Sequence, residues 1–180
     1  GGGLEGGVAG SALELLERHR GDARVVLPLF KTLTLLVSNG CMDALQPPAS
    51  PEPLLLVGAV QAEMRGCKDV PMMQAGASCL CALLQYRDQG VRTPCLQTLI
   101  ALLCHRYPKL RRHVAEHLYV ASLTLGDLCL PERGEEAISA LSENDWGDEV
   151  AGLKPVRDGL YPVFGVERVA PPPKEERPGG

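Results

Sequence analysis

The chain has 180 residues, of which 45% are hydrophobic, 22% are charged and only 4% are aromatic. The net charge of −4 argues against a general nucleic-acid binder, which is normally strongly basic. No apolar run reaches the roughly 18 residues of a membrane span, since the longest candidate, Val25 to Val37, is shorter and contains Lys31. Leu and Ala dominate the apolar residues, which favours helix over strand.

Both ends of the chain have compositions that can bury little surface. Residues 1–10 contain six Gly, so we expect a flexible N-terminal segment there. Residues 167–180 are rich in Pro and charge, so we expect a disordered tail. Between them we expect one helical repeat domain over residues 11–166. The chain starts at Gly and shows no signal peptide, which predicts a fragment of a cytosolic protein with reduced thiols.

Helix start and stop signals divide this domain into about nine helices with no convincing strand. Asp22 and Asp69 are typical N-cap residues, and Asn39-Gly40 is a typical helix stop. Pro28 predicts that the second helix starts late or kinks. The clearest helix starts are Ser11 (in a capping box with Glu14), Asp22, Pro51, Asp69, Pro94, Pro108, Glu135 and Asn144.

The helices fall into pairs of similar length. Starts near Asp22, Asp69 and Pro108 recur at intervals of 47 and 39 residues, which is the range of HEAT and armadillo units. Because one pair cannot bury its apolar face alone, each pair needs neighbours on both sides. The small residues of the run 75–78 would let a neighbouring helix approach closely. We therefore predict an all-α fold, an α-solenoid of HEAT/armadillo-like helix pairs.

One motif has the form of a zinc peptidase site. His113, Glu116 and His117 follow the H-x-x-E-H pattern of inverted zinc peptidases, and two His at i and i+4 share a helix face. A helical wheel places His113 and His117 at the border of the buried side and Glu116 towards solvent. A third ligand is not evident in the sequence. We expect histidines packed in an interhelix groove, with a zinc metallopeptidase as an alternative.

The seven Cys residues do not form a metal-ligand pattern. Cys79 and Cys81 diverge on one helix, Cys95 and Cys104 are out of phase, and the sequence contains no C-x-x-C. We expect most Cys side chains to be small buried hydrophobes. P-loop, dinucleotide-binding and nucleophile-elbow motifs are also missing from the sequence, so we expect no cofactor.

A basic cluster stands out in this acidic chain. Arg106, Lys109, Arg111 and Arg112 lie at a helix–helix corner, and the wheel turns Lys109 and Arg112 to solvent. Such a cluster is either an ordinary solvated surface or a docking patch for an acidic partner. We predict these four residues as a candidate partner-facing surface.

Three stretches of the sequence resemble the C-terminal region of the tubulin-folding cofactor D family (tubulin-specific chaperone D). They are RVVLPLFKTLTLLVSNGCMD (24–43), LCHRYPKLRRHVAEHLYV (103–120) and LSENDWGDEVAGLKPVRDGLYPVFGV (141–166). Their order and spacing match, so the resemblance covers roughly residues 13–166. The family differs at residues 113–117, where its helix has fewer His and Glu, and at Pro155, where its last helix is longer and uninterrupted.

The resemblance implies a large α-solenoid chaperone rather than an enzyme. Members of this family capture β-tubulin released from the chaperonin. They act with cofactors E and C and an Arf-like small GTPase to build or dismantle the α/β-tubulin dimer, and with cofactor C they stimulate GTP hydrolysis by tubulin. The resemblance further implies the cytoplasm, the microtubule cytoskeleton, centrosomes and cell junctions as locations. It supplies no catalytic residue, and the alternative from a different class is a generic HEAT-repeat scaffold for another protein client.

Overall fold

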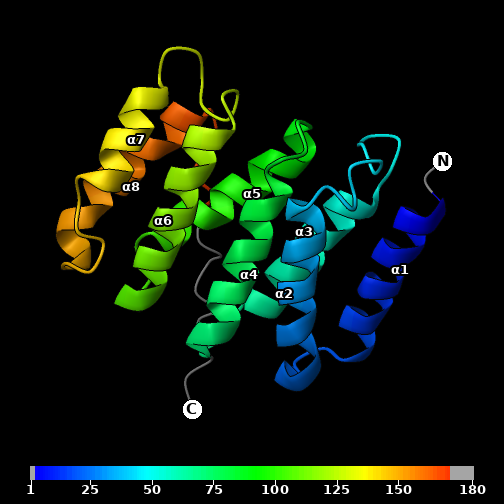
Figure 1. Cartoon of the computed structure of the whole chain (residues 1–180). Helices are drawn as coiled ribbons and strands as arrows, with labels where there is room; N and C mark the ends of the chain where they lie inside the picture. The colour runs from blue at the N-terminus through cyan, green and yellow to red at the C-terminus, as the bar shows by residue number, and fades with distance from the viewer. Residues whose placement is uncertain (1–2, 171–180) are drawn as a thin grey trace.

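The computed structural model of the protein describes residues 3–170, and these residues form eight helices and no strand. The helices follow one another through short turns and loops (Figure 1). Their bounds are α1 Gly3–Arg18, α2 Ala23–Ser38, α3 Glu52–Met64, α4 Val70–Leu83, α5 Gln89–Leu102, α6 Pro108–Thr124, α7 Gly134–Ser142 and α8 Val150–Phe164. None of these helices is long and apolar enough to cross a membrane.

The helices stack in two layers. In one layer α2 packs on α4, α4 on α6 and α6 on α7, while in the other α1 packs on α3, α3 on α5 and α5 on α8 (Figure 1). In each of the pairs α1–α2, α3–α4 and α5–α6, the first helix therefore lies in the layer of α1 and the second in the layer of α2. The last pair is reversed, because α7 joins the layer of α6 and α8 returns to the layer of α5. This arrangement confirms the predicted all-α solenoid of helix pairs.

Local sequence signals account for most helix ends. Asp22 accepts a hydrogen bond from Arg24 N at the start of α2, and Gly40 ends that helix with a φ of +75°. Asp69 Oδ1 accepts from Met72 N at 3.0 Å in the first turn of α4. The predicted late start of α2 is wrong, since the helix runs from Ala23 through Pro28 without interruption.

The first helix begins well before its predicted start. We expected a flexible segment over residues 1–10, but α1 already includes Gly3 to Gly10. Ala9 is fully buried, and Glu5 Oε2 accepts a hydrogen bond from Ala44 N at 2.8 Å. Tertiary contacts therefore hold a glycine-rich turn of helix that local propensity disfavours. Residues 1–2 lie outside the described part of the chain.

Two other predicted helix starts also shift, for reasons of burial. Helix α5 begins at Gln89, before the predicted start at Pro94, because Val91 and Arg92 are buried and fix the preceding turn. Helix α8 begins at Val150 instead of Asn144, because the segment before it forms a turn in which Trp146 is buried. The predicted tail is described only at residues 167–170, where Gln97 Nε2 donates to Glu167 O at 2.9 Å.

A single apolar core lies between the two layers. Its largest fully buried side chains include Phe30, Leu33, Leu80, Leu83, Leu99 and Ile100. Gly76 shows why the run of small residues matters: a Cβ built on it would lie 2.7 Å from Met64 Sδ of α3. The predicted close approach of a neighbouring helix is confirmed at this position.

The seven Cys are free thiols, but they are less buried than predicted. Only Cys79 and Cys95 are buried, and Cys41 is exposed. Burial raises the pKa of the Cys79 thiol to about 12, which keeps this side chain protonated and unreactive at neutral pH. The expectation that most Cys would be buried is therefore wrong, since four of them pack against the core but are only partly buried: Cys67, Cys81, Cys104 and Cys129.

Truncation of Phe30 tests the core. Phe30 is fully buried whereas Leu35, on the same helix, is 63% exposed. We expect Phe30→Ala to lower the free energy of unfolding by about 3–5 kcal/mol, because a large cavity is left in the core. Leu35→Ala is the matched control and should change it by less than about 0.5 kcal/mol. Denaturant titration measures both, and similar losses for the two variants would contradict the described burial.

Candidate functional site

The predicted basic cluster lies where α5 turns into α6. Pro108 begins α6, and Tyr107 precedes it in extended conformation. Arg106 is exposed, donates to Tyr107 Oη at 2.8 Å and lies with its guanidinium carbon 4.7 Å from the centre of the Tyr107 ring. Lys109 is exposed in the first turn of α6. These two cations therefore face solvent, and one of them is held against an aromatic ring.

Arg111 does not belong to the exposed cluster, which corrects the prediction. Its side chain is only 2% exposed. It donates at 2.7 Å to the carbonyl oxygens of Trp146, His105 and Asp148. A buried guanidinium needs such partners because losing water without replacement hydrogen bonds is costly. Arg111 therefore joins the α5–α6 corner to the loop between α7 and α8.

Arg112 is exposed but partly neutralised. Its Nε lies 3.6 Å from Asp145 Oδ1, and its guanidinium lies over Gly147, where a Cβ would overlap it. The exposed cations at this corner are thus Arg106, Lys109 and Arg112, which we call the basic corner. The basic corner retains three of the four predicted residues.

His105, which is half-buried, fixes the backbone of the basic corner through a hydrogen bond. Its Nδ1 accepts a hydrogen bond from Tyr107 N at 3.2 Å. Burial, and then the neighbouring charges of Arg106 and Arg111, lower the pKa of His105. Because both effects disfavour the imidazolium, His105 adds no positive charge to the corner at neutral pH.

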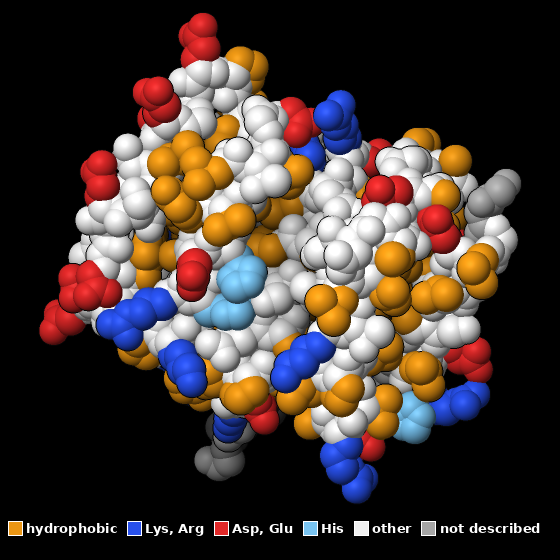
Figure 2. All heavy atoms as spheres, in the orientation of Figure 1, with side chains coloured by type: hydrophobic (Ala, Val, Ile, Leu, Met, Phe, Trp, Pro, Cys, Tyr) orange, Lys and Arg blue, Asp and Glu red, His pale blue; other side chains and the backbone are white. Residues whose placement is uncertain are grey.

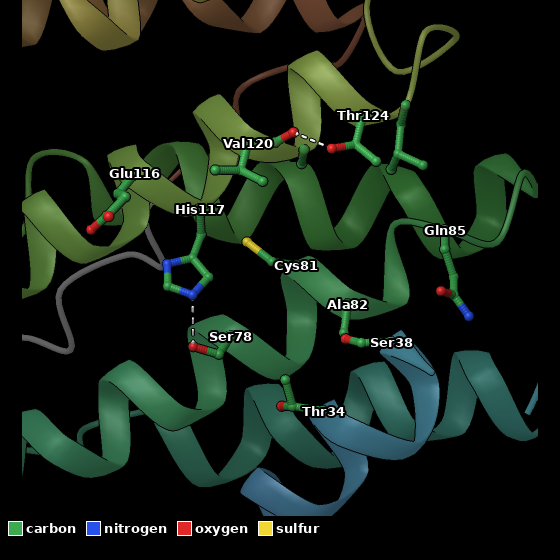
Figure 3. Close-up of a pocket in the computed structure, with 12 residues that line it drawn as sticks. Thr34, Ser38, Ser78, Cys81, Ala82, Gln85, Glu116, His117, Val120 and Thr124 are labelled. Carbon is green, nitrogen blue, oxygen red and sulfur yellow. Dashed lines mark hydrogen bonds between the residues drawn. The ribbon is translucent and has the colours of Figure 1, made fainter. Parts of the chain in front are cut away.

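The two histidines of the H-x-x-E-H motif come together as one unit. The rings of His113 and His117 stack with their centres 4.1 Å apart. Ser78 Oγ of α4 lies 2.8 Å from His113 Nε2. The same oxygen lies 3.4 Å from His117 Nε2 (Figure 3). His117 Nδ1 donates to His113 O at 2.8 Å, so its Nε2 faces Ser78 as an acceptor when the ring is neutral. The predicted packing of both histidines in an interhelix groove is confirmed.

The same geometry does not support a zinc peptidase. Glu116 is exposed and points away from Ser78 (Figure 3). Both Nε2 atoms are directed at the Ser78 hydroxyl. Within residues 3–170, no three His, Cys, Asp or Glu side chains are grouped closely enough to hold a metal ion. The motif therefore lacks a third ligand and an enclosed general base in the described part of the chain.

The histidines line the predicted interhelix groove, whose walls and floor the sequence did not identify. Helices α2 and α6 form its walls and α4 its floor, and it opens as a hollow on the face shown in Figure 2. The floor side chains are small, with Ala75, Ser78 and Ala82 on one face of α4. Their i, i+3, i+7 spacing was the available signal, since side chains of this size cannot fill the space between two flanking helices.

Two further buried cations were also missed. Arg92 Nε donates to Leu84 O at 2.8 Å, and its Nη1 lies 3.1 Å from Asp127 Oδ2. Arg157 Nε donates to Asp158 Oδ1 at 2.7 Å and its Nη1 to Ala101 O at 3.5 Å. Arg92 joins the end of α4 to the loop after α6, and Arg157 joins α8 to the end of α5, so both side chains stabilise the fold.

The fold and the exposed site define an α-solenoid with a basic corner and a groove. Residues 4–72 match the family model described as "Tubulin folding cofactor D C terminal". Over these residues the chain is similar to that family, and the predicted resemblance is confirmed there. The match includes the first of the three similar stretches and ends before the other two. No solved structure matches the chain.

Replacing Arg111 tests its role as a structural clamp. We expect Arg111→Met to lower the free energy of unfolding by about 2–4 kcal/mol, because one buried and two partly buried carbonyl oxygens lose their donor. Arg112→Met, next to it and exposed, should cost less than about 1 kcal/mol. Thermal and denaturant unfolding of the two variants give the comparison. Equal stability of both variants would show that Arg111 does not hold the corner together.

The half-buried His113 predicts a pH dependence of stability. Burial, and then the neighbouring His117, lower the pKa of His113 in the folded chain. The unfolded chain takes up this proton near pH 6.5, whereas the folded chain resists it, so stability falls as the pH drops below that value. We therefore expect His113→Gln to lose less stability than the original chain between pH 7.5 and pH 5.5. Denaturant midpoints at both pH values test this, and equal losses would contradict it.

Proposed function

We propose that this chain is part of a tubulin-folding cofactor and works by binding other proteins rather than by catalysis. The family match of residues 4–72 supports the assignment to a chaperone-type protein. In this proposal residues 11–166 are one helical repeat domain that presents binding surfaces on its outer faces.

The proposed partners are those of the family resemblance. They are β-tubulin, cofactors E and C and an Arf-like small GTPase. The chain binds them during assembly and disassembly of the α/β-tubulin dimer, and it supports GTP hydrolysis by tubulin only together with cofactor C. The proposed location is the cytoplasm, including the microtubule cytoskeleton, centrosomes and cell junctions.

The observation behind the choice of surface is the basic corner. The chain has a net charge of −4, yet Arg106, Lys109 and Arg112 are exposed together at one turn. Tubulin surfaces are strongly acidic, and opposite charges across an interface raise the association rate and select the partner. The fixed position of the corner on the buried Arg111 makes it a defined docking element.

Charge reversal tests the proposal. Arg106 and Lys109 are the best positions, because reversal of Arg112 would place a second carboxylate beside Asp145. We expect the double variant Arg106→Glu, Lys109→Glu to capture about tenfold less tubulin or cofactor at low salt, and the difference to shrink at high salt. The measurement is a pull-down with the immobilised chain, purified tubulin, cofactors E and C and the Arf-like GTPase.

The matched control reverses two exposed charges in the other layer. Arg65 follows α3 and Lys154 lies on α8, and both are exposed. Arg65→Glu, Lys154→Glu changes the net charge by the same amount and should leave capture unchanged. Equal capture by both double variants would disprove the role of the basic corner.

A generic HEAT-repeat scaffold with another client is the second candidate. It is favoured by the extent of the family match, which stops at residue 72. Capture from cytosol followed by mass spectrometry separates the two functions, since the first proposal requires tubulin and its cofactors among the captured proteins.

A further inference from the structure

The groove over α4 is one continuous channel. Its upper part, of about 570 Å³, is lined by Ser38, Gln85 and Thr124 at its far end. Its lower part, of about 430 Å³, reaches Lys31 and Pro71. Thr34 and Ser78 line both parts, so the channel follows α4 from residue 71 to residue 85. At 1.5 Å per residue this is about 21 Å, or four turns of an α-helix.

Both walls of the groove carry exposed apolar side chains that a helix bound in the groove would contact. Leu35 on α2 is 63% exposed and Val120 on α6 is 54% exposed, and each lines the groove from its own side. The floor supplies Ala75 and Ala82 and the hydroxyl of Ser78. This cross-section, with apolar rims over a floor of small side chains, fits the apolar face of an amphipathic helix.

The two ends of the groove differ in charge. The three helices that form it run parallel, since Lys31, Pro71 and His113 line one end and Ser38, Gln85 and Thr124 the other. Helix α4 begins at Val70, beside Pro71, so the partial positive charge of its N-terminus lies at this end. Lys31 lines this same end. Lys109 is exposed one helical turn before His113.

The opposite end of the groove is electrostatically different. The C-termini of α2, α4 and α6 lie there, with the partial negative charges of the helix dipoles. Gln85 at this end donates to Asp43 Oδ1 at 3.2 Å, which places a carboxylate beside the opening. Glu116 is the acidic residue on the wall of α6, about midway along the groove.

We propose that the groove binds an amphipathic α-helix of a partner protein, about four turns long, with acidic residues in its last turn. The helix lies antiparallel to α4, so that its C-terminal end and its carboxylates meet Lys31 and the N-terminus of α4, and its N-terminal end meets the C-termini of α2, α4 and α6. Its apolar face contacts Leu35, Val120 and the small residues of the floor. This goes beyond the proposed function, because it assigns a second surface and needs no tubulin or cofactor.

A second copy of this chain is a less suitable occupant. Helix α3 has Glu63 in its last turn, but both oxygens of this carboxylate accept from Gly21 N at 3.2 Å. Helix α1 does have Glu14 and Glu17 near its end, but Arg18 pairs with Glu14 at 2.8 Å. The charge pattern of the groove therefore favours a foreign helix.

The test uses synthetic helices as probes. One peptide of about sixteen residues has leucines at i, i+4, i+7 spacing and three glutamates in its last turn; a second has the same composition with the glutamates in its first turn. Fluorescence anisotropy with the full chain should show the first peptide binding about fivefold more tightly. Equal affinities, or no binding of the first peptide, would overturn the proposal.

Protein variants locate the binding. Ala82→Leu fills the floor and should abolish binding of the first peptide, while Lys31→Glu should weaken it about threefold to tenfold. Lys154→Glu, an equally exposed lysine on α8, is the matched control and should have no effect. Lys31→Glu changes only a surface charge, so it keeps the test valid if Ala82→Leu unfolds the chain.

Two results would count against the groove. Unchanged binding by Lys31→Glu would place the peptide elsewhere. Light scattering that shows a dimer, dissociated by Ala82→Leu, would assign the groove to a second copy instead. Tubulin is absent from these assays, so their failure leaves the pull-down result intact, and a failed pull-down leaves the peptide result intact.

Discussion

The buried guanidinium of Arg111 determines how the C-terminal half of the chain is held together. Its three hydrogen bonds, each 2.7 Å, end on backbone carbonyls rather than on a carboxylate. A stack of helices with short connections leaves carbonyl groups without partners at every C-terminus, and burial makes each of them expensive. Arg92 and Arg157 meet the same demand at the ends of α4 and α5. Buried arginines thus replace the water that these helix ends would otherwise need.

These arginines also explain how the reversed last pair is attached. Arg92 bridges the end of α4 to Asp127, in the loop after α6, and Arg157 bridges α8 to the end of α5. Arg111 fixes the loop between α7 and α8. The break in repeat order is therefore compensated by long side chains that span from one helix pair to the next. Because Arg111 is turned inward, its neighbours Lys109 and Arg112 are exposed on a corner of fixed shape.

Local chemistry in the sequence predicted most helices, although about nine were expected and residues 3–170 form eight, but it did not predict which helices contact one another. The caps at Asp22 and Asp69 and the stop at Gly40 act within one turn of chain, so the ends they define were predicted correctly. The early part of α1 was missed because its stability comes from Glu5 and Ala9, whose partners are far along the chain. A helical wheel resolves buried from exposed faces only within one helix. It could not show that a loop near Trp146 covers Arg111.

The groove follows from how α4 packs on its two sides. Towards the other layer, Gly76 lets α4 approach Met64 so closely that a Cβ would overlap the sulfur. Towards the outside, Ala75, Ser78 and Ala82 are too small to fill the space between α2 and α6. Because α4 packs closely on α3 and carries only small side chains on its outer face, a groove remains between α2 and α6. Because stacked pairs of a solenoid run parallel, the same packing aligns three helix dipoles along that groove. The parallel stacking of α2, α4 and α6 therefore determines both the shape of the groove and the difference in charge between its two ends.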